Sequence, residues 1–190
     1  AALLCAAGSV RAAVLREASG LVQVRAAGAN SWRPAGSLPL TLGEGDGVRT
    51  GFNARVRVEL RGGSVLEASG NASFFIEADG AGRTSVSALF GSLRLSASAF
   101  GGRAVSLRAP TCLARVRGER AVLRLTVAGG GNAVLEVESG LAGLEDNRGS
   151  QLLVREGQRV AVDLAGLREP TQAPTPSQAR RLDFLSLMRR

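Results

Sequence analysis

Glycine residues divide this chain into short segments, and their spacing constrains its fold more than any other feature of the sequence. Single glycines or glycine clusters recur at close intervals from Gly20 to Gly157. Between them the side chains alternate between apolar and polar, as in residues 122–127, and no long amphipathic helix interrupts this pattern before residue 168. Alternation with a period of two between turn signals is typical of β-strands. The sequence therefore predicts an all-β domain.

Three of the glycines open segments of similar sequence. Gly20, Gly91 and Gly140 each follow a serine or a phenylalanine, and each leads into an alternating strand. A repeated turn of this kind suggests stacked rungs, in which each strand buries its apolar face only against its neighbours. We therefore expect a β-solenoid-like or rolled double sheet of short strands. A β-sandwich would give the same local signals and remains the alternative.

The residue types that the chain lacks exclude most familiar active sites. All 24 basic residues are arginines, and the chain has no histidine and no tyrosine. Without histidine there is no Ser-His-Asp triad, and without lysine there is no Walker lysine or Schiff base. Glu136 and Glu138 alternate on one face of a single strand, whereas glycosidase carboxylates face each other across a cleft. We therefore expect no enzyme, no catalytic residue, no cofactor and no metal site.

The net charge of +8 indicates attraction to acidic partners. The arginines are spread over nearly every strand, and no basic run is interleaved with the aromatic residues that single-stranded nucleic acid needs for stacking. We therefore do not expect a nucleic-acid ligand. An acidic polymer is a candidate partner.

The N-terminal residues 1–7 read like the end of a secretory signal peptide, because two leucines are followed by Cys5 and two alanines. This segment predicts an exported protein, periplasmic or extracellular; an N-terminal extension is the alternative. Cys5 is then removed, lipidated or bonded to Cys112, and the sequence leaves these three outcomes open. If Cys5 is removed, we expect Cys112 to be a small buried hydrophobic residue. No apolar run approaches the length of a membrane span.

The composition changes at Pro170. Residues 169–178 predict an extended proline-rich linker, and residues 179–190 predict a short helix that is not stable alone in water. We expect this helix to dock on a protein partner or a neighbouring subunit through its apolar side chains, which are those of Leu182, Phe184, Leu185, Leu187 and Met188.

A tryptophan motif and a glycine-acid turn precede an alternating strand in the first third of the chain. The motif is SWRPAG at residues 31–36, the turn is LGEGDGVRTG at 42–51, and the strand follows at 54–61. Further segments at 105–118 and 154–162 contain a strand ending in proline, a V-R-G sequence and a G-Q strand. In this order the segments resemble the signatures of the FecR-like domain family, over roughly residues 8–168.

The resemblance assigns a structural role to nine signature residues. They are Trp32, Pro34, Gly43, Asp46, Thr50, Gly51, Pro110, Gly118 and Gly157. The loop around Asp46 lacks the spaced oxygen ligands of a calcium loop, so we interpret it as a tight turn. The chain departs from the family pattern at Glu119, where the family usually has threonine, and by one extra glycine before Asp46.

The resemblance also implies a function. Sensor members of the family carry a cytoplasmic anti-sigma segment, one membrane helix and a periplasmic FecR-like domain, and this chain resembles the stand-alone secreted members. It implies a non-enzymatic protein-interaction module of the bacterial cell envelope, acting in recognition or signalling, with an acidic envelope polymer as a further candidate partner. The alternative is a structural subunit that self-assembles, or joins a larger complex, through strand edges and the C-terminal arm.

Overall fold

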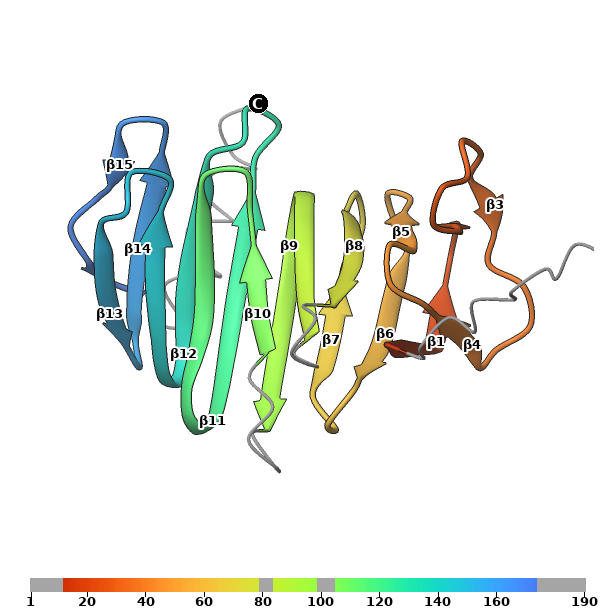
Figure 1. Ribbon diagram of the computed structural model, residues 1–190, viewed down its shortest axis with the longest axis horizontal. Helices are drawn as coiled ribbons and strands as arrows, with labels where there is room; N and C mark the ends of the chain where they lie inside the picture. Colours follow the sequence, from red (N-terminus) through yellow and green to blue (C-terminus); the bar gives the residue numbers. More distant parts are fainter. Residues whose placement is uncertain (1–11, 79–83, 99–104, 174–190) are drawn as a thin grey trace, which may run out of the picture.

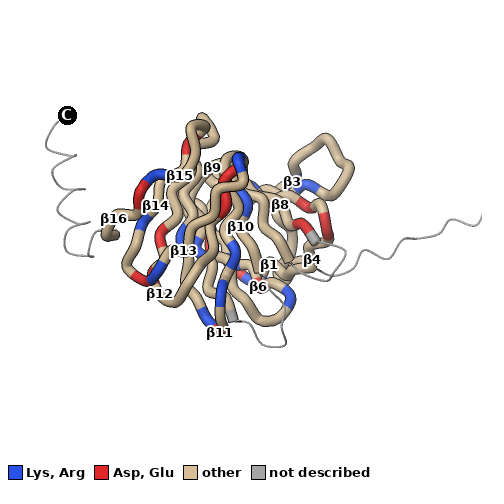
Figure 2. Tube along the Cα trace, turned by 60° about the vertical axis from the view of Figure 1, so that its left-hand side comes forward, with Lys and Arg blue, Asp and Glu red and all other residues tan. Residues whose placement is uncertain are grey.

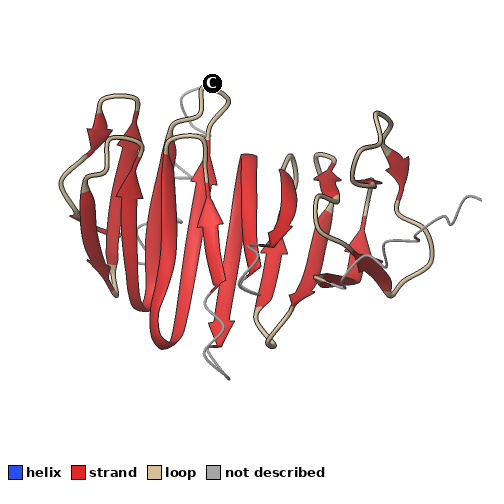
Figure 3. Ribbon diagram, viewed as in Figure 1, coloured by secondary structure: helices blue, strands red, loops and turns tan. Residues whose placement is uncertain are grey.

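The computed structural model describes residues 12–78, 84–98 and 105–173, and all regular structure in these residues is β-strand (Figure 3). This confirms the all-β prediction. The C-terminal helix expected over 179–190 and the N-terminal segment 1–7 lie outside the described residues. The strands are β1 (Ala13–Ser19), β2 (Val22–Arg25), β3 (Arg33–Pro34), β4 (Leu40–Leu42), β5 (Gly47–Thr50), β6 (Arg55–Leu60), β7 (Val65–Ala68), β8 (Ser73–Ala78), β9 (Thr84–Ser98), β10 (Val105–Arg108), β11 (Cys112–Val127), β12 (Ala133–Asp146), β13 (Gln151–Arg155), β14 (Gln158–Asp163), β15 (Gly166–Leu167) and β16 (Thr171–Gln172).

The strands form one open hydrogen-bonded sheet whose pairing falls into two rows (Figure 1). The first row contains, in order, β4, β1, β6, β7, the second half of β9, the second half of β11, the first half of β12, β14 and β15. The second row contains β3, β2, β5, β8, the first half of β9, β10, the first half of β11, the second half of β12 and β13.

The two rows bury a common core. Inward and outward side chains alternate along most of the longer strands, so that in β6 Val56, Val58 and Leu60 are buried while Arg55 and Arg57 are exposed. Leu66 and Leu123 of the first row and Phe74 and Leu107 of the second row are fully buried and belong to one hydrophobic cluster. An alternating strand can bury one face completely only when another layer covers it. The rows therefore pack face to face, which confirms the rolled double sheet.

The three longest strands pass from one row to the other at glycines. Gly91 in β9, Gly118 in β11 and Gly140 in β12 have φ of 97°, 84° and 83°, a region that other residues rarely adopt. At Gly91 a side chain would also collide with the neighbouring corner, because a Cβ atom would lie 2.5 Å from the Cα atom of Ala72. The repeated glycines at Gly20, Gly91 and Gly140 are thus corners of the double sheet.

One part of the chain makes a complete solenoid turn. The first half of β9 lies in the second row, its second half crosses to the first row, and β10 returns to the second row. As a result β10 pairs in parallel with the first half of β9, whereas every other strand pairing in the described residues is antiparallel. Strands shared between both rows distinguish this fold from a β-sandwich, in which each strand belongs to one sheet.

The sheet extends beyond residue 168, where the proline-rich linker was expected to begin. Thr171 and Gln172 form β16, which pairs with Arg159 and Gln158 of β14. The Thr171 hydroxyl donates a hydrogen bond to the carbonyl of Arg159 at 3.3 Å. Backbone pairing at Thr171 and Gln172, which a composition-based boundary ignores, keeps these two residues on the sheet.

Candidate functional site

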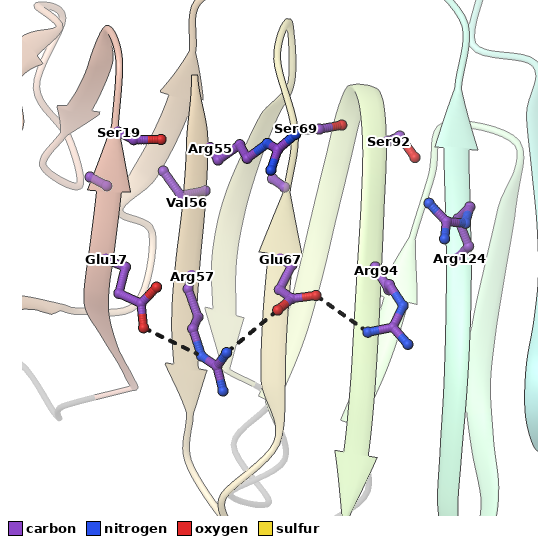
Figure 4. Close-up of a pocket in the computed structure, with 12 residues that line it drawn as sticks. Glu17, Ser19, Arg55, Val56, Arg57, Glu67, Ser69, Ser92, Arg94 and Arg124 are labelled. Carbon is purple, nitrogen blue, oxygen red and sulfur yellow. Dashed lines mark hydrogen bonds and ion pairs between the residues drawn. The ribbon is translucent and has the colours of Figure 1, made fainter. Parts of the chain in front are cut away.

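An open groove of about 500 Å³ lies on the outer face of the first row (Figure 4). Five strands supply its walls, namely β1, β6, β7, β9 and β11. Its polar side chains are four arginines, two glutamates and three serines, which are Arg55, Arg57, Arg94, Arg124, Glu17, Glu67, Ser19, Ser69 and Ser92. Outside β1, where a register shift leaves both Arg16 and Glu17 exposed, these groups alternate with buried residues, so the strands that bury the core also hold them in place.

The charged side chains of the groove belong to a longer line that runs across the strands, and we call it the charge ladder. Its seven members are directly opposite one another in successive strands of the first row: Glu17, Arg57, Glu67, Arg94, Arg124, Glu136 and Arg159. Glu67 lies 3.6 Å from Arg57 and 3.3 Å from Arg94, and these pairs tie three strands together. Opposite charges on directly facing residues stabilise a sheet modestly.

Arg94 and Arg124 are the two like charges that face each other in the ladder. Glu138, one pleat away on β12, accepts hydrogen bonds from both, at 2.8 Å from Arg94 Nε and 2.5 Å from Arg124 Nη2. Burial alone would raise the pKa of Glu138, but the two guanidinium groups outweigh it and hold the pKa below its ordinary value. The glutamate therefore stays ionised and neutralises a contact that would otherwise be repulsive.

The groove has a second strip, without carboxylates, beside the ladder. Ser19, Ser69 and Ser92 point outward there, together with Arg55 (Figure 4). Arg55 is exposed and forms no ion pair with the described residues. This strip offers one free guanidinium and several hydroxyls, so it can donate and accept hydrogen bonds with a bound partner.

Outside the groove, Trp32 packs over the backbone of β5. A Cβ atom on Gly47 would lie 3.0 Å from the Trp32 ring and 2.7 Å from the Phe75 ring. The guanidinium carbon of Arg25 lies 5.3 Å from the Trp32 centroid and 4.7 Å from that of Phe75. Trp32 is therefore half-buried in a cation–π cluster on the second row, and Pro34 lies beside it in the two-residue strand β3.

In the glycine-acid turn, Asp46 and Thr50 form hydrogen bonds to the backbone of neighbouring turns. The Asp46 carboxylate accepts hydrogen bonds from the backbone N–H groups of Ala27 and Gly43, both at 2.8 Å. Thr50 is buried, accepts from the N–H of Ala72 at 2.9 Å and donates to the carbonyl of Ser69 at 2.8 Å.

The remaining signature residues also lie at turns and corners. The N–H of Gly51 donates to the carbonyl of Leu21, and the carbonyl of Pro110 accepts from the Asn147 side chain. Gly118 and Gly157 have positive φ where the chain changes rows. These signature residues act on the backbone, and none of them lines the groove.

The cysteines and the candidate metal ligands lie as follows in the described part of the chain. No group of three His, Cys, Asp or Glu side chains is placed there to hold a metal ion. Cys112 is buried in the core, where loss of solvent raises the pKa of its thiol to about 11. Cys5 lies outside the described residues, as do the predicted docking side chains Leu182, Phe184, Leu185, Leu187 and Met188. Residues 12–78, 84–98 and 105–173 contain no helix long and apolar enough to span a bilayer.

The sequence did not reveal the charge ladder. The outward arginines of residues 54–61 were visible as the polar face of a strand, and Glu136 and Glu138 as a row on another. Which of them meet depends on the pairing register of strands far apart in the chain. In the structure, acidic and basic positions are interleaved over the strands (Figure 2).

Comparison with known proteins identifies the family. Residues 46–143 match the family described as FecR protein. The match spans more than half of the chain and includes five of the seven ladder residues. The chain belongs to the FecR protein family. No curated protein matches it.

Two solved structures share the fold. Both are crystal structures of a "putative anti-sigma factor" from Parabacteroides distasonis ATCC 8503, with a TM-score of 0.58 and identities of 12% and 11%. Each alignment covers 67% of this chain and 59% of that protein, so the chain matches less than two thirds of the length of these neighbours. At this identity the likeness shows the fold alone.

Proposed function

We propose that this protein is a non-enzymatic protein-interaction module of the bacterial cell envelope, acting in recognition or signalling, and that it binds its protein partner in the groove beside the charge ladder. The groove carries the proposal, because it gathers side chains of both charges and several hydroxyls on one rigid sheet. Charges fixed on strands select a partner by electrostatic complementarity.

Family membership supports a regulatory role, and the description of the structural neighbours as anti-sigma factors points the same way by analogy. The envelope location rests on the signal-like residues 1–7 and on the family. Cell fractionation of the source bacterium with an antibody against the protein tests the location. Recovery in the cytoplasm would contradict it.

The partner is tested with two matched variants. Arg55→Glu reverses a charge in the groove, and Arg49→Glu reverses one on the outer face of the second row. Both arginines are exposed, and neither has an ion pair among the described residues, so both variants should fold. The immobilised protein is incubated with envelope extract, and each retained protein is then purified and titrated against all three forms.

We expect one partner whose Kd is similar for the wild type and Arg49→Glu and at least tenfold weaker for Arg55→Glu, because a desolvated charge of the wrong sign opposes binding. If no retained protein distinguishes Arg55→Glu from Arg49→Glu, the groove is not the binding site.

A further inference from the structure

The charges of the ladder have an order that is complementary to its own reverse. From β1 to β14 the signs are minus, plus, minus, plus, plus, minus, plus. When the order is read from β14 to β1 instead, each of the three positions on either side of the middle has the opposite sign to the one it has in the first reading. The middle position is Arg94, with three strands on either side.

We infer that the outer face of the first row pairs with the same face of a second copy of this chain, about a two-fold axis that passes through Arg94. A two-fold axis reverses the ladder of the second copy and makes the interface isologous. Glu17 then faces Arg159 of the second copy, Arg57 faces Glu136, and Glu67 faces Arg124. Because each contact occurs twice, six of the seven ladder positions meet an opposite charge.

The same order of charges rejects neighbouring registers. If the second copy is displaced by one strand toward β14, every facing pair has like charges. Displacement by one strand toward β1 leaves attraction only between Glu67 and Arg94 and places like charges at the other four positions. Like charges that face each other across an interface oppose association, so the ladder favours a single alignment of the two copies.

Arg94 is the position where like charges meet on the axis. Each Arg94 is held by its own Glu138 at 2.8 Å and by Glu67 at 3.3 Å. The hydrogen bond from Arg94 to Glu138 raises the pKa of the arginine, and the two carboxylates offset the charge that it would present to its copy. The centre of the interface is therefore nearly neutral.

The face is large enough for a specific dimer. Seven strands spaced about 4.8 Å apart, each about 20 Å long, give about 600 Å² on each copy and about 1,200 Å² in total, which is at the low end of specific interfaces. The groove of one copy then lies over β14, β12, β11, β9 and β7 of the other. This dimer does not depend on the proposed partner, although a partner in the groove would have to displace the second copy.

Analytical ultracentrifugation of the purified full chain tests the dimer. We expect a reversible dimer in about 50 mM salt that weakens at least tenfold in about 500 mM salt, because screening reduces attraction between exposed charges. Glu17→Arg and Arg159→Glu should each weaken it at least tenfold, since each places two pairs of like charges across the interface. Glu77→Arg, on the outer face of the second row, is the control and should have no effect.

Mixing the two single variants gives the sharpest result. In a mixed dimer the new positive charge of the Glu17→Arg copy would face the new negative charge of the Arg159→Glu copy, and the second contact would be the wild-type pair. We therefore expect an equimolar mixture to form a heterodimer of near wild-type affinity, with circular dichroism confirming that each variant folds. A monomer at low salt, a dimer insensitive to both variants, or a mixture that stays monomeric would each overturn the inference. None of these outcomes bears on partner binding, which the Arg55→Glu titration tests separately.

Discussion

Glu138 lies within hydrogen-bond distance of two guanidinium groups that face each other on neighbouring strands. Its side chain is 24% exposed, compared with 36% for Arg94 and 44% for Arg124, so it is the most shielded of the three. Partial burial strengthens charge-assisted hydrogen bonds relative to those at an exposed surface. A single carboxylate thus allows the ladder to contain two adjacent arginines.

Replacing this carboxylate should cost stability in a pH-dependent way. We expect Glu138→Gln to lower the free energy of unfolding by about 1 kcal/mol at pH 7. Because the pKa of Glu138 is lowered in the folded protein, its contribution is complete above the ordinary pKa of about 4.3 and is lost as pH falls through the folded value. Urea unfolding at pH 7 and pH 3 measures this difference.

Glu136→Gln is the matched control, because Glu136 lies on the same face of β12 without an ion pair within 4.0 Å in the described residues. It should cost less than half as much at pH 7. Equal losses for the two variants, or a loss for Glu138→Gln that persists at pH 3, would contradict this account.

At the scale of elements, the corners decide how the strands can stack. Gly91 and Gly118 both turn the chain from one row to the other with positive φ. They differ in their surroundings: a Cβ atom at Gly91 would touch the backbone of Ala72, whereas nothing lies within 4 Å of one at Gly118. Gly91 is therefore required both for its positive φ and because Ala72 leaves no space for a side chain. Gly118 is required for its positive φ alone.

Alanine substitutions separate the two requirements. Gly118→Ala should lower the free energy of unfolding by roughly 1–2 kcal/mol, the cost of a left-handed conformation. Gly91→Ala should cost about 3 kcal/mol or more, since the collision with Ala72 adds to that strain. Chemical denaturation of both variants gives the comparison. If Gly91→Ala were no worse than Gly118→Ala, close stacking of the corners would not matter for stability.

The sequence predicted the corners but not the charge ladder, because the corners depend on local signals and the ladder depends on the pairing of distant strands. Glycine turns and alternating side chains are local signals, so they predicted the strands, the repeated units at Gly20, Gly91 and Gly140, and the rolled double sheet. The contact between Arg57 and Glu67 spans one hairpin, but that between Arg94 and Glu138 joins β9 to β12 through an intervening strand. Register between distant strands is set by the whole core, and no short segment encodes it.

For the molecule as a whole, the pairing is richest in the middle of the double sheet and poorest at its ends. β9, β11 and β12 pair with strands in both rows, whereas β3, β4, β15 and β16 are two or three residues long. Opening of the central strands would break both rows at once. Opening of the end strands would break only a few hydrogen bonds.

Hydrogen exchange measured by mass spectrometry should show this gradient. We expect the slowest amides in the buried halves of β9, β11 and β12, around Leu93, Leu123 and Leu135, because they exchange only through global unfolding. The amides of β4 and β16 should exchange much faster, through local opening. Protection in β4 equal to that around Leu93 and Leu123 would contradict the gradient.

The position of the two ends of the described sheet has a mechanical consequence. The chain enters at β1 and leaves at β16 beside β14, at opposite ends of the long axis of the molecule (Figure 1). Six strand spacings of about 4.8 Å separate β1 from β14, or roughly 29 Å. A pull on the two ends would act across the strands and load their hydrogen bonds one strand at a time. The domain would then lengthen by peeling of β1 at one end and of β16 and β14 at the other, while the three central strands would separate last.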